Sequence, residues 1–139
     1  MSISTKILEL STAGRGDMVD ITRAVVAAVE ESALKNGVVT LFTPSATSAL
    51  TTIEYEPGCV EDLQRLFDEI IDPARDYAHN ARWGDGNGHS HVRAALLGAS
   101  LTIPFVDGSL TLGTWQQIIF VDFDNRSRRR RLVAQIIGE

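Results

Sequence analysis

All three histidines of the chain, His79, His89 and His91, fall within residues 77–91. Imidazole titrates close to neutral pH and is the commonest protein ligand for zinc-like metals. Glycine alternates with polar residues between His79 and His89, and such a loop lets backbone N–H groups converge on an anion. The pattern lacks the Lys-Ser/Thr ending of a nucleotide-binding loop. The stretch therefore predicts the functional centre of the chain.

The spacing of the histidines predicts a shared site. His89 and His91 are two residues apart, so an extended backbone would point both rings to one face, whereas a helix would separate them by about half a turn. A glycine-rich turn before His89 can bring His79 back to the pair, giving three imidazoles with one open position, as catalytic zinc sites require. Asp85 or Glu54 could supply a carboxylate in place of one ring. The alternative is that one histidine makes a local hydrogen bond while the others are solvated, and metal ligation and direct substrate contact both remain open.

Two further candidates lie outside this stretch. Glu54 ends an apolar, threonine-rich strand, where partial burial would suit proton transfer, although its spacing favours an edge carboxylate near an arginine. Trp115 stands between Thr114 and Gln116, where its indole either belongs to the core or stacks on a ligand ring.

The arginines are unevenly distributed, with five of them in residues 126–131. Guanidinium groups match the oxygens of phosphate and carboxylate, so this run could contact an anion or another subunit. We favour the other interpretation, a solvated turn that enters an edge strand.

Length, composition and charge narrow the number of domains and the classes of function that we expect. A chain of 139 residues with 44% hydrophobic and 22% charged residues predicts one domain over residues 1–139. A net charge of −5 argues against general nucleic-acid binding. No window is apolar enough to cross a membrane and residues 1–7 lack the pattern of a secretory signal, so we expect no membrane partner and a cytoplasmic location. Cys59 is the one cysteine, which excludes an internal disulfide and a multi-cysteine zinc site.

Hydrophobic periodicity, caps and turn residues predict the elements. Helices are expected from Asp20 to Asn36, from Pro57 to Asp72 and from Ser90 to Gly98. Strands are expected over residues 3–10, 38–43, 49–55, 100–106, 110–112, 115–123 and 131–137. Helices come early and a run of hairpins comes late, which favours an α+β fold with a largely antiparallel sheet.

Three blocks, residues 50–58, 83–94 and 108–117, resemble in order and spacing the YjbQ-like family of secondary thiamine-phosphate synthases. The resemblance implies a compact α+β domain with an antiparallel β-sandwich and two to three helices, usually assembled as a homotrimer. It also implies a metal or anion near the histidines, with zinc or magnesium as the divalent candidates. The implied activity joins hydroxymethylpyrimidine diphosphate to thiazole phosphate and releases pyrophosphate.

The resemblance also assigns site residues. It implies catalytic roles for Glu54, His79, His89 and His91, with the three histidines as metal ligands. It implies substrate binding by Asn87, Gly88, Thr114, Trp115 and Gln116. The residues themselves add Asp85 and Arg93 as substrate-binding candidates, with Arg93 as a cation for a departing diphosphate. Ser45 departs from the family pattern, because many members carry histidine there, and this leaves the metal stoichiometry and the substrate open.

Two other functions fit the same residues. One is a non-catalytic module that binds a small phosphorylated or otherwise anionic metabolite in the glycine loop. The other is a metal-assisted hydrolase, for which chelation would remove activity.

Overall fold

Two antiparallel sheets and four helices form the fold in the computed structural model, which describes residues 1–139. The larger sheet has the strand order β1 (Ser2–Thr12), β8 (Arg128–Gly138), β3 (Gly37–Phe42), β5 (Ser100–Val106) and β6 (Ser109–Leu110). The smaller sheet has the order β2 (Asp17–Asp20), β7 (Gln117–Asp122) and β4 (Ser48–Ile53). The helices are α1 (Thr22–Ser32), α2 (Pro57–Ile70), α3 (Ala78–Trp83) and α4 (Gly88–Leu97).

The smaller sheet is buried on both faces. Alternate residues of a strand point to opposite sides, and in β7 Ile118 and Phe120 join a core cluster shared with α1 and the larger sheet. Ile119 and Val121 join a second cluster, which lies beneath α2 and α4. This double burial explains why β7 is apolar at successive positions instead of alternating with polar residues.

The predicted fold class is confirmed, although there are four helices where two to three were expected. The β5–β6 hairpin turns at Asp107 and Gly108, as predicted, with φ values of 50° and 78°. The remainder of the expected hairpin run is wrong. β7 pairs with β2 and β4, and β8 pairs with β1 and β3, because the apolar run of β7 suits the inner strand of the doubly covered sheet.

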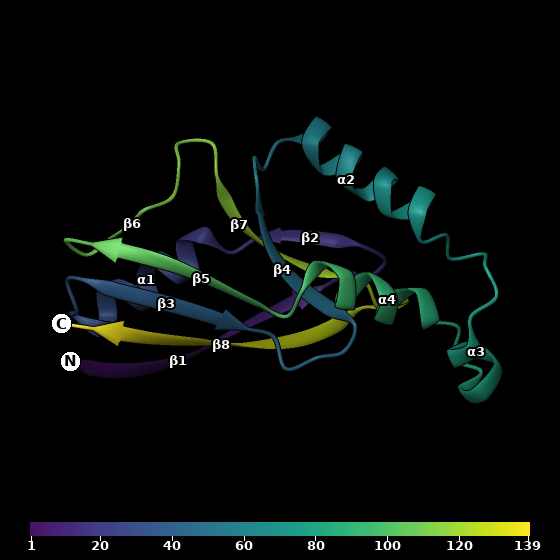
Figure 1. Cartoon of the computed structure of the whole chain (residues 1–139), viewed down its shortest axis with the longest axis horizontal. Helices are drawn as coiled ribbons and strands as arrows, with labels where there is room; N and C mark the ends of the chain where they lie inside the picture. The colour runs from purple at the N-terminus through teal and green to yellow at the C-terminus, as the bar shows by residue number, and fades with distance from the viewer.

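The long strands place the termini at one end of the molecule and α2, α3 and α4 at the other (Figure 1). The register agrees, since Ser2 pairs with Gly138 at the terminal end and Thr12 pairs with Arg128 at the helical end. The histidine stretch therefore lies at the end remote from the termini. No helix has the length and apolar character needed to cross a membrane.

Candidate functional site

An open cleft of about 460 Å³ lies at the helical end of the sheets. One wall is the connection from β3 to β4, residues 43–47, and the opposite wall comes from α3, α4 and the loop between them. The start of β8 supplies charged residues to the same cleft. The cleft therefore joins segments from three distant parts of the chain.

Two of the three imidazoles meet in this cleft. The rings of His79 on α3 and His91 on α4 have centroids 4.4 Å apart and planes inclined by 43°. Nδ1 of His79 lies 3.4 Å from Oδ1 of Asp85, which also lines the cleft. Asn87 lies between two acids: its Nδ2 donates to Asp124 at 3.4 Å, and with the amide reversed it would donate to Asp85 at 3.0 Å.

The turn between α3 and α4 determines how the two rings meet. Gly84 ends α3 with a φ of 72°, in the left-handed region that suits glycine. Gly88 begins α4 by donating its N–H to Oδ1 of Asn80 at 2.8 Å. A Cβ on Gly88 would lie 2.5 Å from Cβ of Tyr77, so only glycine allows this close approach. Gly88 is thus a packing residue that brings α4 back against α3.

His89 does not share the cleft. Helix α4 begins at Gly88, so the helical alternative holds, and His89 and His91 diverge by about 200° around its axis. The side of α4 that carries His89 faces inward: the residue is 9% exposed, and its ring centroid is 6.2 Å from that of Tyr77. Nδ1 of His89 has no hydrogen-bond partner in the chain.

His89 makes stability depend on pH. Burial lowers the pKa of His89, and the nearby charge of Arg93 lowers it further against the opposing effects of Asp124 and Asp68. The unfolded chain therefore takes up this proton at a higher pH than the folded chain. We expect stability to be retained above about pH 6.5 and to fall below it, by at most about 1.4 kcal/mol per pH unit from this residue. Urea unfolding at several pH values measures the slope.

A matched pair of variants tests the source of this slope. His89→Gln should flatten the pH dependence, whereas His79→Gln should keep it, because His79 is in the open cleft. Equal slopes for the wild type and His89→Gln would contradict the assignment.

Strand β8 points successive arginines of the run to opposite faces of the sheet. Arg129 and Arg131 lie near Glu9 on β1 and are exposed, as the solvated interpretation predicts, but the expected edge strand is wrong, because β8 lies between β1 and β3. Arg128 and Arg130 instead face the cleft, so for these two residues the interpretation of a solvated turn is wrong. The physical reason is the period of two, which gives alternate residues opposite environments.

Two buried aspartates hold the cleft arginines. Nε and Nη2 of Arg130 donate to the carboxylate of Asp122 at 2.7 and 2.9 Å, and Nε of Arg128 donates to Asp124 at 2.7 Å. Burial alone would raise the pKa of Asp124, but hydrogen bonds from Arg128, from the backbone of Asn125 and from Asn87 hold that pKa below its usual value. Hydrogen bonding to Asp122 raises the pKa of Arg130 against the effect of burial. Asp124 and Arg130 therefore keep their charges.

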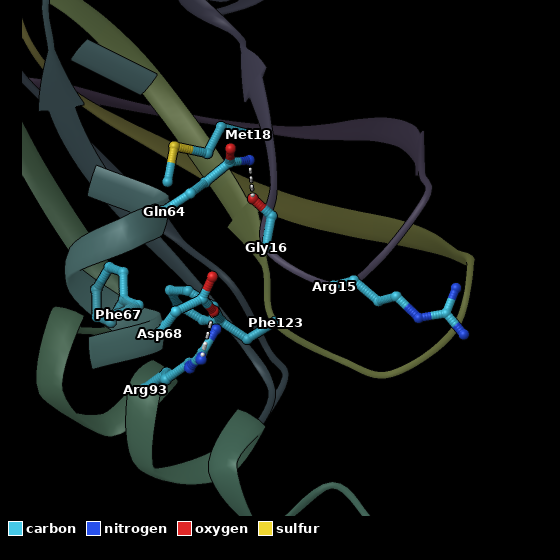
Figure 2. A pocket seen from close by; sticks show the side chains of 8 residues that line it. All are labelled: Arg15, Gly16, Met18, Gln64, Phe67, Asp68, Arg93 and Phe123. Atoms are coloured by element: carbon cyan, nitrogen blue, oxygen red, sulfur yellow. Dashed lines mark hydrogen bonds and ion pairs between the residues drawn. The ribbon is translucent and has the colours of Figure 1, made fainter. Parts of the chain in front are cut away.

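Arg93 lies away from the cleft and ties α4 to α2 (Figure 2). Its Nη2 donates to Oδ1 of Asp68 at 3.0 Å and to the carbonyl oxygen of Ile71 at 2.8 Å. Its guanidinium also lies 5.9 Å from the centre of the Phe67 ring. The residue is 5% exposed and lines a separate cavity of about 160 Å³. In this chain its contacts are those of a packing residue.

The remaining predicted residues lie at the opposite end of the smaller sheet. Ser48 pairs with Asp122 at the cleft end, and Ile53 pairs with Gln117 about 17 Å further along the strand. At that far end Glu54 is exposed and Trp115 is 72% exposed. Gln116 donates to Oγ1 of Thr52 at 3.0 Å, and Thr114 lies in the same exposed segment as Trp115. The structure does not bring these residues to the histidines within one chain.

Several residues that line the cleft had no predicted role, among them Trp83, Ser45 and Thr47. Trp83 is 68% exposed and presents an indole to the cleft, while Ser45 and Thr47 present hydroxyl groups beside Arg130. The signals were the position of Trp83 within the histidine stretch and the hydroxyl-rich segment after Pro44. Neither signal specifies which distant residues complete the cleft.

The two sheets and the cleft with its imidazoles and anchored arginines define a small α+β protein with an open polar cleft. The family described as UPF0047 protein YjbQ-like matches residues 6–139, and the chain belongs to this family. A UPF0047 protein of Methanothermobacter thermautotrophicus is 37% identical, over 100% of this chain and 95% of its own. UPF0047 protein YugU of Bacillus subtilis is 34% identical, over 96% and 98% of the two chains.

Solved structures agree with the fold. A YbjQ-like protein of unknown function from Sulfolobus solfataricus is similar with a TM-score of 0.94 and 36% identity, covering 99% of each chain. A hypothetical protein from Aeropyrum pernix is similar with a TM-score of 0.91 and 32% identity, covering 98% of this chain and 99% of its own. These similarities establish the family and its fold, so the function must be argued from the cleft.

Proposed function

We propose that the cleft binds phosphorylated substrates and that the chain is a transferase of the thiamine-phosphate synthase type. The observation that carries the proposal is that His79 and His91 share one open cleft with Arg128. Imidazole and guanidinium N–H groups bind phosphate oxygens and stabilise negative charge that develops on a leaving group. The family resemblance of the sequence supplies the choice of substrates.

In this reaction the ring nitrogen of thiazole phosphate forms a bond to the methylene carbon of hydroxymethylpyrimidine diphosphate. The carbon–oxygen bond to the diphosphate breaks, and its electron pair leaves with pyrophosphate. Arg128 and the imidazoles would stabilise that departing charge. Trp83, the exposed indole of the cleft, would stack on a heteroaromatic ring, a contact that favours ring recognition without fixing the ring's identity.

A divalent metal, which the resemblance implies, does not fit the donors of this chain. No three His, Cys, Asp or Glu side chains converge closely enough to hold an ion. His79 and His91 form only a pair, and the neighbouring carboxylate of Asp85 is turned toward His79. We therefore assign the stabilisation of charge to protein N–H and O–H groups and propose no step through a metal.

A second function, capture of an anionic metabolite without turnover, is favoured by one observation. Both cleft arginines already pair with buried aspartates, an arrangement that holds donors in place without requiring chemistry. Such a module would use the same cleft, so only turnover separates the two functions.

We expect the purified protein, given both phosphorylated precursors, to form thiamine phosphate and pyrophosphate in equal amounts. Chromatography of the products with a coupled pyrophosphate assay measures this, with and without added Mg²⁺ and with a chelator. Formation that survives the chelator supports a reaction driven by the protein's own donors. Binding of the precursors without any product would contradict the transferase and leave the binding module.

A further inference from the structure

Arg130 fixes the direction of two hydroxyl groups at the wall of the cleft. Oγ of Ser45 accepts hydrogen bonds from Nη1 of Arg130 at 3.0 Å and from the backbone N–H of Thr47 at 3.2 Å. Oγ1 of Thr47 accepts from Nη2 of Arg130 at 2.9 Å. A hydroxyl group has two lone pairs and one proton, so Ser45 has its acceptor capacity filled and only its proton left to donate.

Neither hydroxyl proton is committed within the chain. The oxygens of Ser45 and Thr47 lie 3.5 Å apart, at the outer limit of a hydrogen bond. Both residues line the cleft, with Ser45 half-buried and Thr47 6% exposed. Two O–H donors are thus available to an acceptor that enters the cleft.

Arg130 cannot readily leave this position. Its carboxylate partner, Asp122, is fully buried and also accepts from Oγ1 of Thr12 at 2.5 Å. The side chain of Arg130 is 14% exposed and makes four hydrogen bonds to Ser45, Thr47 and Asp122. Taking two charges out of water is costly, so such a network contributes more to fixing geometry than to stability. Arg130 is therefore a positioning residue for the two hydroxyl groups.

We propose that Ser45 and Thr47 form the subsite for a terminal phosphate group, with Arg130 directing their protons and Arg128 adding a charged donor. This inference rests on the proposed function, because it takes the ligand of the cleft to be phosphorylated. Oxygens of a phosphate dianion only accept hydrogen bonds, which matches the hydroxyl of Ser45, whose oxygen already accepts two hydrogen bonds and whose proton is left to donate. Nε and Nη2 of Arg128 contact Asp124, and its Nη1 makes no hydrogen bond in the chain.

The two ion pairs cancel in charge, so hydroxyl donors carry much of the selectivity for phosphate. Arg128 and Arg130 bring two positive charges, and Asp122 and Asp124 bring two negative ones. A hydrogen bond to a charged group changes affinity by about 10-fold or more. Loss of one hydroxyl should therefore be measurable even though the arginines remain.

Inorganic phosphate is the probe, titrated into the intact protein by calorimetry. We expect Ser45→Ala and Thr47→Val each to weaken binding by about 10-fold, and Thr47→Ser, which keeps the hydroxyl, to bind nearly as tightly as the wild type. Thr102→Val removes an exposed hydroxyl on β5, outside the cleft, and should leave the affinity unchanged. Thr47→Ser and Ser45→Ala keep the test decisive if Thr47→Val does not fold, which urea unfolding would reveal.

No phosphate binding by the wild type at millimolar concentration, or unchanged affinity in Ser45→Ala and Thr47→Val, would overturn the subsite. The transfer assay separates this outcome from the proposed function. Product formation with unchanged phosphate affinity and KM in the variants would reject the subsite and retain the transferase. Weakened phosphate binding in a protein that forms no product would retain the subsite and reject the transferase.

Discussion

Asp122→Asn should lower the free energy of unfolding by about 3 to 5 kcal/mol, a large fraction of the stability of a domain of this size. The substitution keeps the shape of the side chain but removes the negative charge that Arg130 contacts through two hydrogen bonds. Asp124 lies 3.8 Å from Arg130 and compensates only in part. Urea unfolding measures the loss, and we expect the midpoint to fall while the slope of the free energy against urea concentration stays the same.

Two controls show whether burial is the cause. Glu9→Gln removes the partner of the exposed Arg129 and Arg131, and we expect it to cost less than about 1 kcal/mol. Asp122→Leu combined with Arg130→Met removes both buried charges and should recover most of the stability. Its phosphate affinity should be lower than that of the wild type, because Ser45 and Thr47 lose the guanidinium that directs their protons. A loss below about 1 kcal/mol in Asp122→Asn would contradict the assigned role of this ion pair.

His91→Ala should lower kcat/KM for the transfer reaction by about 10²- to 10³-fold, the usual cost of removing one donor to developing charge. The imidazole is half-buried in the cleft beside His79 and makes no hydrogen bond within the chain, so its removal leaves no polar group of the protein unpaired. Initial rates of thiamine phosphate formation at several substrate concentrations measure the effect.

Val92→Ala is the matched control, since Val92 follows on the same helix and its side chain is 46% exposed. We expect its kcat/KM to equal that of the wild type. If product forms and His91→Ala also retains the full rate, the cleft is not the place where transfer occurs.

Local sequence signals predicted most elements of the fold. Asp20 accepts hydrogen bonds from the backbone N–H and the hydroxyl of Thr22 at the start of α1, and Pro57 begins α2, as their types suggest. The assignment of strands to sheets could not be predicted in the same way. Ser2 pairs with Gly138 at the far end of the chain, and no short window of sequence records such a pairing.

Candidate site residues were predicted where an unusual residue type gathers in one stretch. They were missed where neighbouring residues are alike or show no periodicity. Residues 77–91 contain every histidine, and they do supply the imidazoles of the cleft. Gly88 and its polar neighbours carry no helical periodicity, so the start of α4 and the separate position of His89 were not apparent. Residues 128–131 are all arginine, and a uniform run conceals which members face inward.

The connection at residues 43–47 leaves one sheet and enters the other, and backbone hydrogen bonds hold both of its ends. Thr43 donates its N–H to the carbonyl of Ala99, and Thr47 accepts from the N–H of Phe123, but neither contact depends on the side chains between them. We therefore expect the scaffold to stay folded when Ser45 is replaced, although the hydrogen bonds that its hydroxyl accepts from Arg130 and from the N–H of Thr47 are lost. Relatives that diverge at this short bridge could acquire different ligand preferences while inheriting the same architecture.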